Sequence, residues 1–219
     1  YVAKDYTVSG ESFEVWRCAT CSGGFTQNVP DAATIGPYYA AESYVSHTDS
    51  EKGFINNVYH KVRRFSLLTK KKLVLHLVHK PTGTLLDIGA GTGAFVHTMQ
   101  TAGWQVTGLE PDATAAKQAL LKYNIQLQPA EHIYTLGSHQ FDAITMWHVL
   151  EHVHDLHGYF KRFAELLQPS GILVIAVPNY TSTDAKIYAQ NWAALDTPRH
   201  LYHFSPASME LLANKHGFK

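Results

Sequence analysis

Apolar and polar positions alternate along the chain with two different periods. Apolar residues from about 57 to 79 recur near helical spacing, which predicts an amphipathic helix. Beyond residue 81, short apolar runs bounded by Gly, Pro and polar residues predict buried strands, each followed by a stretch of helical spacing. The predicted strands are 84–88, 105–109, 125–127, 141–146 and 171–177, and the predicted helices are 95–102, 113–122, 156–167 and 206–216.

This alternation predicts the fold class. Apolar strands that alternate with helices are typical of a mostly parallel sheet covered on both faces. We therefore expect an α/β domain, a three-layer α/β/α sandwich, in residues 81–219. Residues 57–80 would form a linking helix, and residues 1–56, rich in Tyr, Gly, Ser, Asn and Pro, a small N-terminal cover segment.

Composition excludes several classes of function. The chain has 18 Lys and Arg against 18 Asp and Glu, a formal net charge of zero. Because binding to phosphates needs a basic excess, we do not expect a nucleic-acid partner. No apolar run approaches the roughly 18 residues of a membrane span, and no signal peptide is visible. We expect a cytoplasmic protein that acts on a small molecule, and the sequence carries no signal for an oligomeric state.

A glycine-rich loop follows the first predicted strand of the α/β domain. It reads Asp87-Ile-Gly-Ala-Gly-Thr-Gly93 and leads into a predicted helix. Glycines let the backbone turn sharply and approach a ligand closely. Glu110 ends the next strand, where an acid can hold ribose hydroxyls. These two features suit NAD and S-adenosylmethionine equally, since the loop also satisfies the dinucleotide pattern.

Four segments together resemble class I S-adenosylmethionine-dependent methyltransferases, of the type 11/12/23-like branch. They read LLDIGAGTG from Leu85, VTGLEP from Val106, FDAITMWHVLEHV from Phe141 and LLQPSGILV from Leu166. The resemblance implies a Rossmann-like fold and transfer of a methyl group to an oxygen, nitrogen or carbon of a small molecule or of a sugar or lipid intermediate. It also implies that the chain is a fragment at both ends, without the family's C-terminal hairpin.

The resemblance also implies which residues hold the cofactor. Asp87, just before the glycines, favours a cofactor with a positive amino group, because it would repel a pyrophosphate. The implied cofactor-binding residues are Asp87, Gly89, Ala90, Gly91, Gly93, Glu110, Pro111, Ala130, Glu131 and Trp147. An NAD-dependent oxidoreductase and a non-enzymatic cofactor-binding or zinc-ribbon module remain the alternatives.

Histidines and aromatic residues are candidates for the substrate side. The candidate catalytic residues are His148, His200 and His203, at the end of the fourth strand and on the loop after the fifth. Imidazole titrates near neutral pH, so it can remove a proton from a hydroxyl. The candidate substrate contacts are Tyr39, Tyr44, His47 and Arg199.

Two motifs raise the question of a metal. The string from His148 to His152 spells H-x-x-E-H, a zinc-peptidase pattern, which needs both histidines on one helical face and a third ligand elsewhere. Because its surroundings resemble a methyltransferase, we interpret it as a strand end and expect no metal in this chain. Cys18 and Cys21 resemble one knuckle of a zinc ribbon, half of a site in a longer protein. Here we expect two free, buried cysteines.

Overall fold

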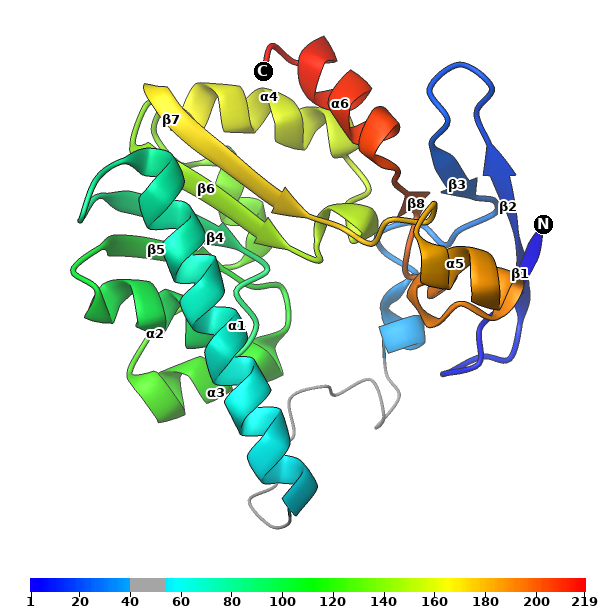
Figure 1. Ribbon diagram of the computed structural model, residues 1–219, viewed down its shortest axis with the longest axis horizontal. Helices are drawn as coiled ribbons and strands as arrows, with labels where there is room; N and C mark the ends of the chain where they lie inside the picture. The colour runs from blue at the N-terminus through cyan, green and yellow to red at the C-terminus, as the bar shows by residue number, and fades with distance from the viewer. Residues whose placement is uncertain (40–53) are drawn as a thin grey trace. The chain divides into compact units, whose positions relative to one another are not determined.

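The computed structural model describes residues 1–39 and 54–219, and their side chains except those of residues 54–59. The chain divides into two compact units (Figure 1). Unit 1 combines Tyr1–Ser46, His148–Lys161 and Ala176–Lys219, and unit 2 combines His47–Trp147 and Arg162–Ile175. The predicted boundaries cut the chain into continuous blocks, whereas unit 1 is assembled from three separate segments.

Unit 2 is built on a four-stranded sheet of order β5-β4-β6-β7. Its strands are β4 (Thr84–Ile88), β5 (Gln105–Leu109), β6 (Phe141–Trp147) and β7 (Leu167–Ala176). The central strand β4 is parallel to both β5 and β6, and its Asp87 is level with Gly108 on one side and Thr145 on the other. The ends of β4, β5 and β6 therefore lie together along one edge of the sheet.

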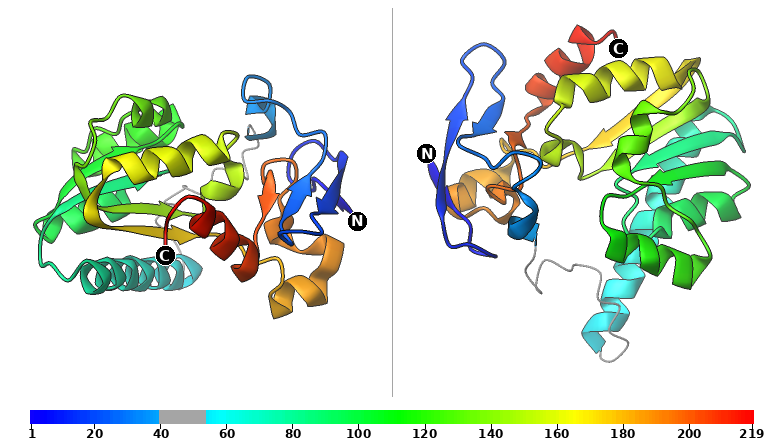
Figure 2. Two further views of the ribbon diagram at one scale, coloured as in Figure 1. Left: turned by 90° about the horizontal axis from the view of Figure 1, so that it is seen from above. Right: turned by 180° about the vertical axis from the view of Figure 1, so that it is seen from behind.

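Helices flank this sheet. They are α1 (Phe54–Val78), α2 (Ala94–Thr101), α3 (Ala113–Tyr123) and the end of α4 (Leu156–Leu166). Figure 2 shows α1 along one face of the sheet and α4 along the other. Val74 of α1 is fully buried in one core cluster with Leu85 of β4 and Met99 of α2. The predicted α/β fold with a parallel sheet is confirmed, and α1, expected as a linking helix, contributes to its core.

Two predicted elements differ from the structure. Residues 125–127 form no strand: Ile125 and Leu127 are buried against α2 and α3, and only Gln128 bridges to Leu109. The apolar pattern there reflects packing and not sheet pairing. β7 begins at Leu167, four residues before the predicted strand 171–177. Among the described strands β7 is an edge strand, and an edge tolerates Pro169 because proline lacks only a hydrogen-bond donor.

Unit 1 has its own antiparallel sheet, of order β1-β2-β3-β8. Its elements are β1 (Val2–Lys4), β2 (Ser12–Arg17), β3 (Gly24–Thr26), β8 (Tyr202–His203), α5 (Thr183–Tyr188) and α6 (Pro206–Lys215). Ser205 caps α6 in a capping box with Ser208. Residues 40–53 lie outside the described part of the chain, and with them the candidate substrate contacts Tyr44 and His47. No helix in the described part is long and apolar enough to cross a bilayer.

Candidate functional site

The glycine loop of unit 2 turns at the end of β4. The backbone N–H groups of Gly89 and Ala90 both donate to the carbonyl oxygen of Leu109, at 2.8 and 2.9 Å, which fixes the loop to the end of β5. Gly93 has φ 74°, and a Cβ there would lie 2.9 Å from the Cβ of Ala119. Only glycine therefore allows the sharp turn and the close approach of α3 at this position.

Glu110 holds its carboxylate against the same loop. Its Oε2 accepts a hydrogen bond of 2.6 Å from the N–H of Gly91, and its Oε1 accepts one of 2.9 Å from the N–H of Asp112. The side chain is thus fixed in one place at the end of β5. A carboxylate oxygen has two lone pairs, so a carboxylate held in this way can also accept hydrogen bonds from a ligand.

The segment after α3 runs beside the end of β5. The N–H of Glu110 donates to the carbonyl of Gln128 at 2.8 Å, and the N–H of Gln128 donates to Gly108 at 2.9 Å. Pro129 then leads into the 3-10 turn η2 (Ala130–Tyr134). This places Ala130 and Glu131 shortly after the segment that pairs with β5. Glu131 and Pro111 are exposed.

Asp87 and Trp147 carry buried polar groups that have few or no hydrogen-bond partners. Asp87 is buried, and it accepts a 2.7 Å hydrogen bond from Thr145. Burial raises the pKa of its carboxyl to about 7, although Thr145 and Lys70 act in the opposite direction. The indole N–H of Trp147 is buried with no hydrogen-bond partner among the described residues. A polar ligand at this edge would satisfy these groups.

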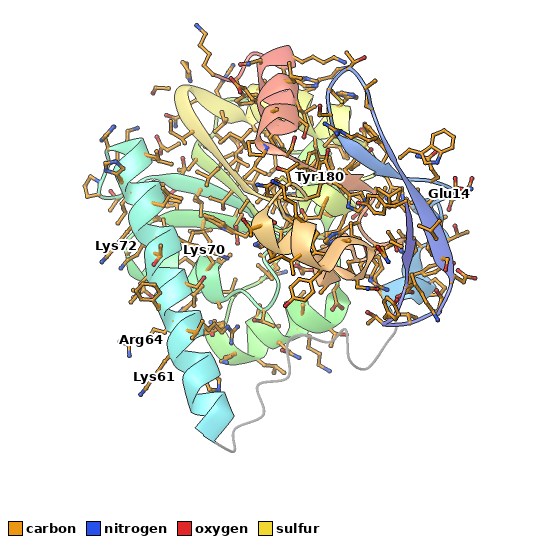
Figure 3. The ribbon with its side chains drawn as sticks, turned by 45° about the vertical axis from the view of Figure 1, so that its right-hand side comes forward. Glu14, Lys61, Arg64, Lys70, Lys72 and Tyr180 are labelled. Carbon is orange, nitrogen blue, oxygen red and sulfur yellow. The ribbon has the colours of Figure 1, made fainter. Side chains whose placement is uncertain are left out.

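Lys70 supplies the positive charge near this edge. Its Nζ lies 4.7 Å from the centre of the Trp147 ring, and Figure 3 shows it on the side of α1 that faces the sheet. Burial lowers the pKa of its ammonium group, while Asp87 acts to raise it. The glycine loop, the fixed carboxylate and the unpaired indole N–H fit a cofactor that carries both hydroxyl and charged groups.

Unit 1 contains a cavity of about 640 Å³. Its lining includes His148, Glu151, His152, Asp184, Trp192 and His200. Among the described residues that line it are two acidic side chains and three histidines, but no Lys or Arg. The cavity therefore suits a neutral or cationic occupant better than an anion.

Glu151 is the residue of this cavity that sequence reasoning missed as a site residue. Its side chain is 1% exposed, and neither carboxylate oxygen has a hydrogen-bond partner among the described residues. Burial raises the pKa of this carboxyl to about 7. The nearest nitrogens recorded are Nδ1 of His148 at 3.8 Å and Nε2 of His200 at 4.0 Å from its Oε1. A signal for it existed, because Glu151 stands in the H-x-x-E-H string, but its burial was not foreseen.

Two histidines of the cavity are oriented by backbone carbonyls. Nδ1 of His200 lies 2.9 Å from the carbonyl oxygen of Ala194, and Nδ1 of His152 lies 3.0 Å from that of Arg199. The two rings meet edge to face with their centres 4.6 Å apart. Burial lowers the pKa of His200 to about 4 and that of His152 to about 3. Both imidazoles are therefore neutral at neutral pH.

The other candidate residues of unit 1 divide between the cavity and the interior. His148 lines the cavity, whereas His203 does not: it is buried, and its Nε2 lies 2.9 Å from Oγ1 of Thr26. Arg199 was expected to contact substrate, and this expectation is corrected. Its side chain is 1% exposed and is paired with Asp5 and Asp196. Residues 150–152 form a 3-10 turn, so the helical face of a zinc peptidase is absent there.

The cysteines also differ from expectation. Cys18 and Cys21 are free but half-buried, not buried. Backbone N–H groups of Cys21 and Thr20 bond to the Cys18 sulfur and lower its pKa. This is favourable for a thiolate at position 18.

Tyr39, a candidate substrate contact, is half-buried with its hydroxyl 3.1 Å from Nδ1 of His152.

Known proteins resemble this chain over its larger part. A family model described as a methyltransferase domain matches residues 59–219. A ubiquinone biosynthesis O-methyltransferase of Rhodopseudomonas palustris (strain HaA2) is 30% identical over 145 residues, 61% of this chain and 56% of the relative. A protein of the same name from Caulobacter vibrioides is 33% identical over 105 residues, which are 45% of this chain and 42% of the relative. The chain thus spans about half the length of the curated relatives it matches.

The fold also has a counterpart among solved structures. A SAM-dependent methyltransferase from Archaeoglobus fulgidus superposes with a TM-score of 0.60 at 22% identity, covering 72% of this chain and 69% of that one. At this identity the likeness concerns the fold alone.

Proposed function

The chain belongs to the methyltransferase domain family, in its S-adenosylmethionine-dependent class I form, and we propose that it transfers a methyl group to a hydroxyl oxygen of a neutral small molecule. S-adenosylmethionine is the cofactor of this family, which removes the NAD-dependent oxidoreductase as an alternative. It brings an already activated methyl group. The residues of this chain then have to bind the cofactor, orient it and present the acceptor.

The contact between Glu110 and Gly91 carries the cofactor half of the proposal. The 2.6 Å hydrogen bond fixes the carboxylate beside the glycine loop before any ligand binds. Two ribose hydroxyls would find their acceptors in place, so little ordering is needed on binding. Asp87 would bind the positive amino group of the methionine part, and the Trp147 indole N–H would gain a partner.

The cavity of unit 1 supports the choice of acceptor. Its described lining includes Glu151 and Asp184 but no Lys or Arg that would neutralise a phosphate or carboxylate. Ser182 and Asn179 can exchange hydrogen bonds with hydroxyl groups, and Trp192 offers a flat apolar surface. The two bacterial relatives are named as O-methyltransferases, which supports oxygen as the atom methylated.

Two measurements test the proposal. Isothermal titration with S-adenosylhomocysteine should show one site, and NAD should give no heat. A panel of acceptors, each offered as the free hydroxyl compound and as its phosphate ester, should take up radiolabelled methyl from S-adenosylmethionine only in the free form. Methylation of the phosphate esters alone would contradict the proposed acceptor class and leave the cofactor result intact.

His148 remains the predicted catalytic histidine that is most accessible from the cavity. Its side chain is 63% exposed, whereas that of His200 is 10% exposed. Once an acceptor is known, we expect His148→Ala to lower turnover and to leave the affinity for S-adenosylhomocysteine unchanged. A variant that loses cofactor affinity together with rate would place His148 in the cofactor site instead.

A further inference from the structure

Three side chains that could bind a metal lie close together in the cavity of unit 1. One carboxylate oxygen of Glu151 and one nitrogen each of His152 and His200 lie within 4.8 Å of one another. Glu151 is 1% exposed, and neither of its oxygens has a hydrogen-bond partner among the described residues. A buried carboxylate without a donor is costly, so its surroundings call for a positively charged or proton-donating partner.

The backbone fixes which nitrogen His200 presents. A carbonyl oxygen can only accept, so Nδ1 of His200 carries the hydrogen that it donates to Ala194. Nδ1 of His152 lies between the carbonyl oxygen of Arg199, at 3.0 Å, and the hydroxyl of Tyr39, at 3.1 Å. Nε2 of His200 therefore keeps a free lone pair, and it lies 4.0 Å from Oε1 of Glu151. Histidines that bind metals are characteristically held in this way, with the other ring N–H donated to a backbone carbonyl.

The charges around the cluster add to the case. A further acid lies beside it, because Oδ2 of Asp196 is 4.0 Å from Nε2 of His200. A dication bound at the cluster would be attracted by this carboxylate as well as by that of Glu151.

We propose that Glu151, His152 and His200 bind one divalent transition-metal ion, zinc being the first candidate. Two imidazole nitrogens and one carboxylate oxygen are the donor set of many catalytic zinc sites, whereas magnesium and calcium prefer oxygen ligands only. The sequence led us to expect no metal, because the surroundings of the H-x-x-E-H string resemble a methyltransferase. In the structure His200 joins Glu151 and His152 of the string, and the string's first histidine, His148, is not part of the cluster.

Such a site would be open on one side. All three ligands line the cavity, so the ion's remaining coordination positions would face the space that the proposed function assigns to the acceptor. A bound dication lowers the pKa of a coordinated hydroxyl, which would make the acceptor oxygen more nucleophilic. This role rests on the proposed function, but metal binding itself does not.

Zinc binding can be measured without any substrate. The protein with Cys18→Ser and Cys21→Ser, which removes the thiols as competing ligands, would be stripped with a chelator and titrated with zinc chloride alone. We expect one ion per chain. Glu151→Gln and His200→Ala should weaken binding by more than the roughly 10–100-fold typical of changes in groups that only support a ligand. Glu210→Gln, an exposed acid on α6, is the matched control and should bind as the parent does.

A second readout separates loss of the site from loss of the fold. Zinc should raise the midpoint of thermal unfolding of the parent and of Glu210→Gln, but not of Glu151→Gln. Cobalt in place of zinc should give a visible spectrum with no sulfur-to-cobalt charge transfer. Zinc binding that is equal in Glu151→Gln, or absent from the folded thiol-free parent, would overturn the proposal. Binding of S-adenosylhomocysteine to the same samples shows separately whether the cofactor half of the proposed function holds.

Discussion

The carboxylate of Glu110 accepts a 2.6 Å hydrogen bond from the backbone N–H of Gly91, 19 residues earlier in the chain. The bond joins the ends of two neighbouring parallel strands, the edge at which open α/β sheets bind their ligands. It also predisposes the side chain to receive ribose hydroxyls, because the carboxylate needs no reorientation.

Replacing Glu110 should therefore weaken cofactor binding. We expect Glu110→Ala to reduce the affinity for S-adenosylhomocysteine by roughly 1–3 kcal/mol, since two hydroxyls lose a charged acceptor. Glu110→Gln, which keeps the shape and one acceptor, should lose less. Isothermal titration measures both, with Glu210→Gln as the exposed control. Unchanged affinity in the Ala variant would remove Glu110 from the site.

Asp87 predicts a dependence on pH. Burial raises the pKa of its carboxyl from 3.8 to about 7, so the folded protein favours the protonated form. Its contribution to the unfolding free energy therefore falls as pH rises from about 4 through about 7. A cofactor ammonium group beside Asp87 would favour the ionised form, so binding should release a proton and tighten as pH rises across about 7.

The test compares the parent with Asp87→Asn. Titration with S-adenosylmethionine in buffers of different ionisation enthalpy reports the released proton directly. In Asp87→Asn both the proton release and the pH dependence should vanish, and urea unfolding should lose part of its pH dependence. An identical pH profile in the two proteins would show that Asp87 does not titrate on binding.

The elements that the sequence predicted well are those with a purely local signal. The strand 105–109 has the same bounds in the structure, because an apolar run closed by Gly103 and Pro111 determines it locally. β7 extends back through Pro169, ahead of the predicted strand 171–177, because β6 provides a hydrogen-bonding neighbour, which no local pattern reveals. Ile125 and Leu127 show the converse, an apolar pattern created by helix packing alone.

The same distinction applies to the sites. The glycine loop and Glu110 lie within one strand–loop–strand unit, so motif and spacing predicted their meeting. Glu151 and His200 come from segments far apart in the chain, and only the tertiary fold brings them within 4.0 Å. Arg199 was taken for a substrate contact because its partner Asp5 lies 194 residues away. Charged residues beside a site cannot be sorted into ligand contacts and structural pairs without such long-range information.

Arg199 predicts a large loss of stability. Its guanidinium donates to the buried Asp5, to the half-buried Asp196 and, at 2.8 Å, to the carbonyl of Tyr38. Arg199→Met should lower the unfolding free energy by about 3–5 kcal/mol, because it leaves the buried carboxylate of Asp5 without a counter-charge. The exposed Arg17→Met should change it by no more than about 0.5 kcal/mol. Urea unfolding measures both, and similar losses in the two variants would contradict the structural role.

The ion pair between Asp5 and Arg199 also predicts how the stability of the protein changes at low pH. Burial acts to raise the pKa of Asp5, but hydrogen bonds from Ser9 and Arg199 outweigh it and lower the value to about 2. The stabilisation by this carboxylate is therefore complete above about pH 4 and is lost as pH falls towards about 2. Asp5→Asn should remove that part of the acid sensitivity. If the variant and the parent lose stability in parallel below about pH 4, other carboxylates dominate.

Cys18 and Cys21 predict unequal thiol reactivity. Backbone N–H groups of Cys21 and Thr20, followed by the Cys21 side chain, hydrogen-bond the Cys18 sulfur and lower its pKa. The turn is held by the N–H of Cys18 on the carbonyl of Gly23 at 2.9 Å. Since the thiolate is the reactive form, Cys18 should react first with a chromogenic disulfide reagent near neutral pH. Cys18→Ser should abolish the fast phase, and Cys21→Ser should retain it at a reduced rate.

The reactivity also bears on the zinc-knuckle prediction. An arrangement of N–H groups that stabilises a thiolate at position 18 equally stabilises a thiolate bound to zinc, and two thiolates fill only half of a tetrahedral site. Zinc added to the Glu151→Gln variant of this chain should therefore protect the cysteines from the reagent only weakly. Adding a segment that provides two further cysteines should make the protection strong. If the two single variants react at equal rates, and zinc changes neither the reaction of this chain nor that of the extended chain, Cys18 and Cys21 only form a turn and do not bind zinc.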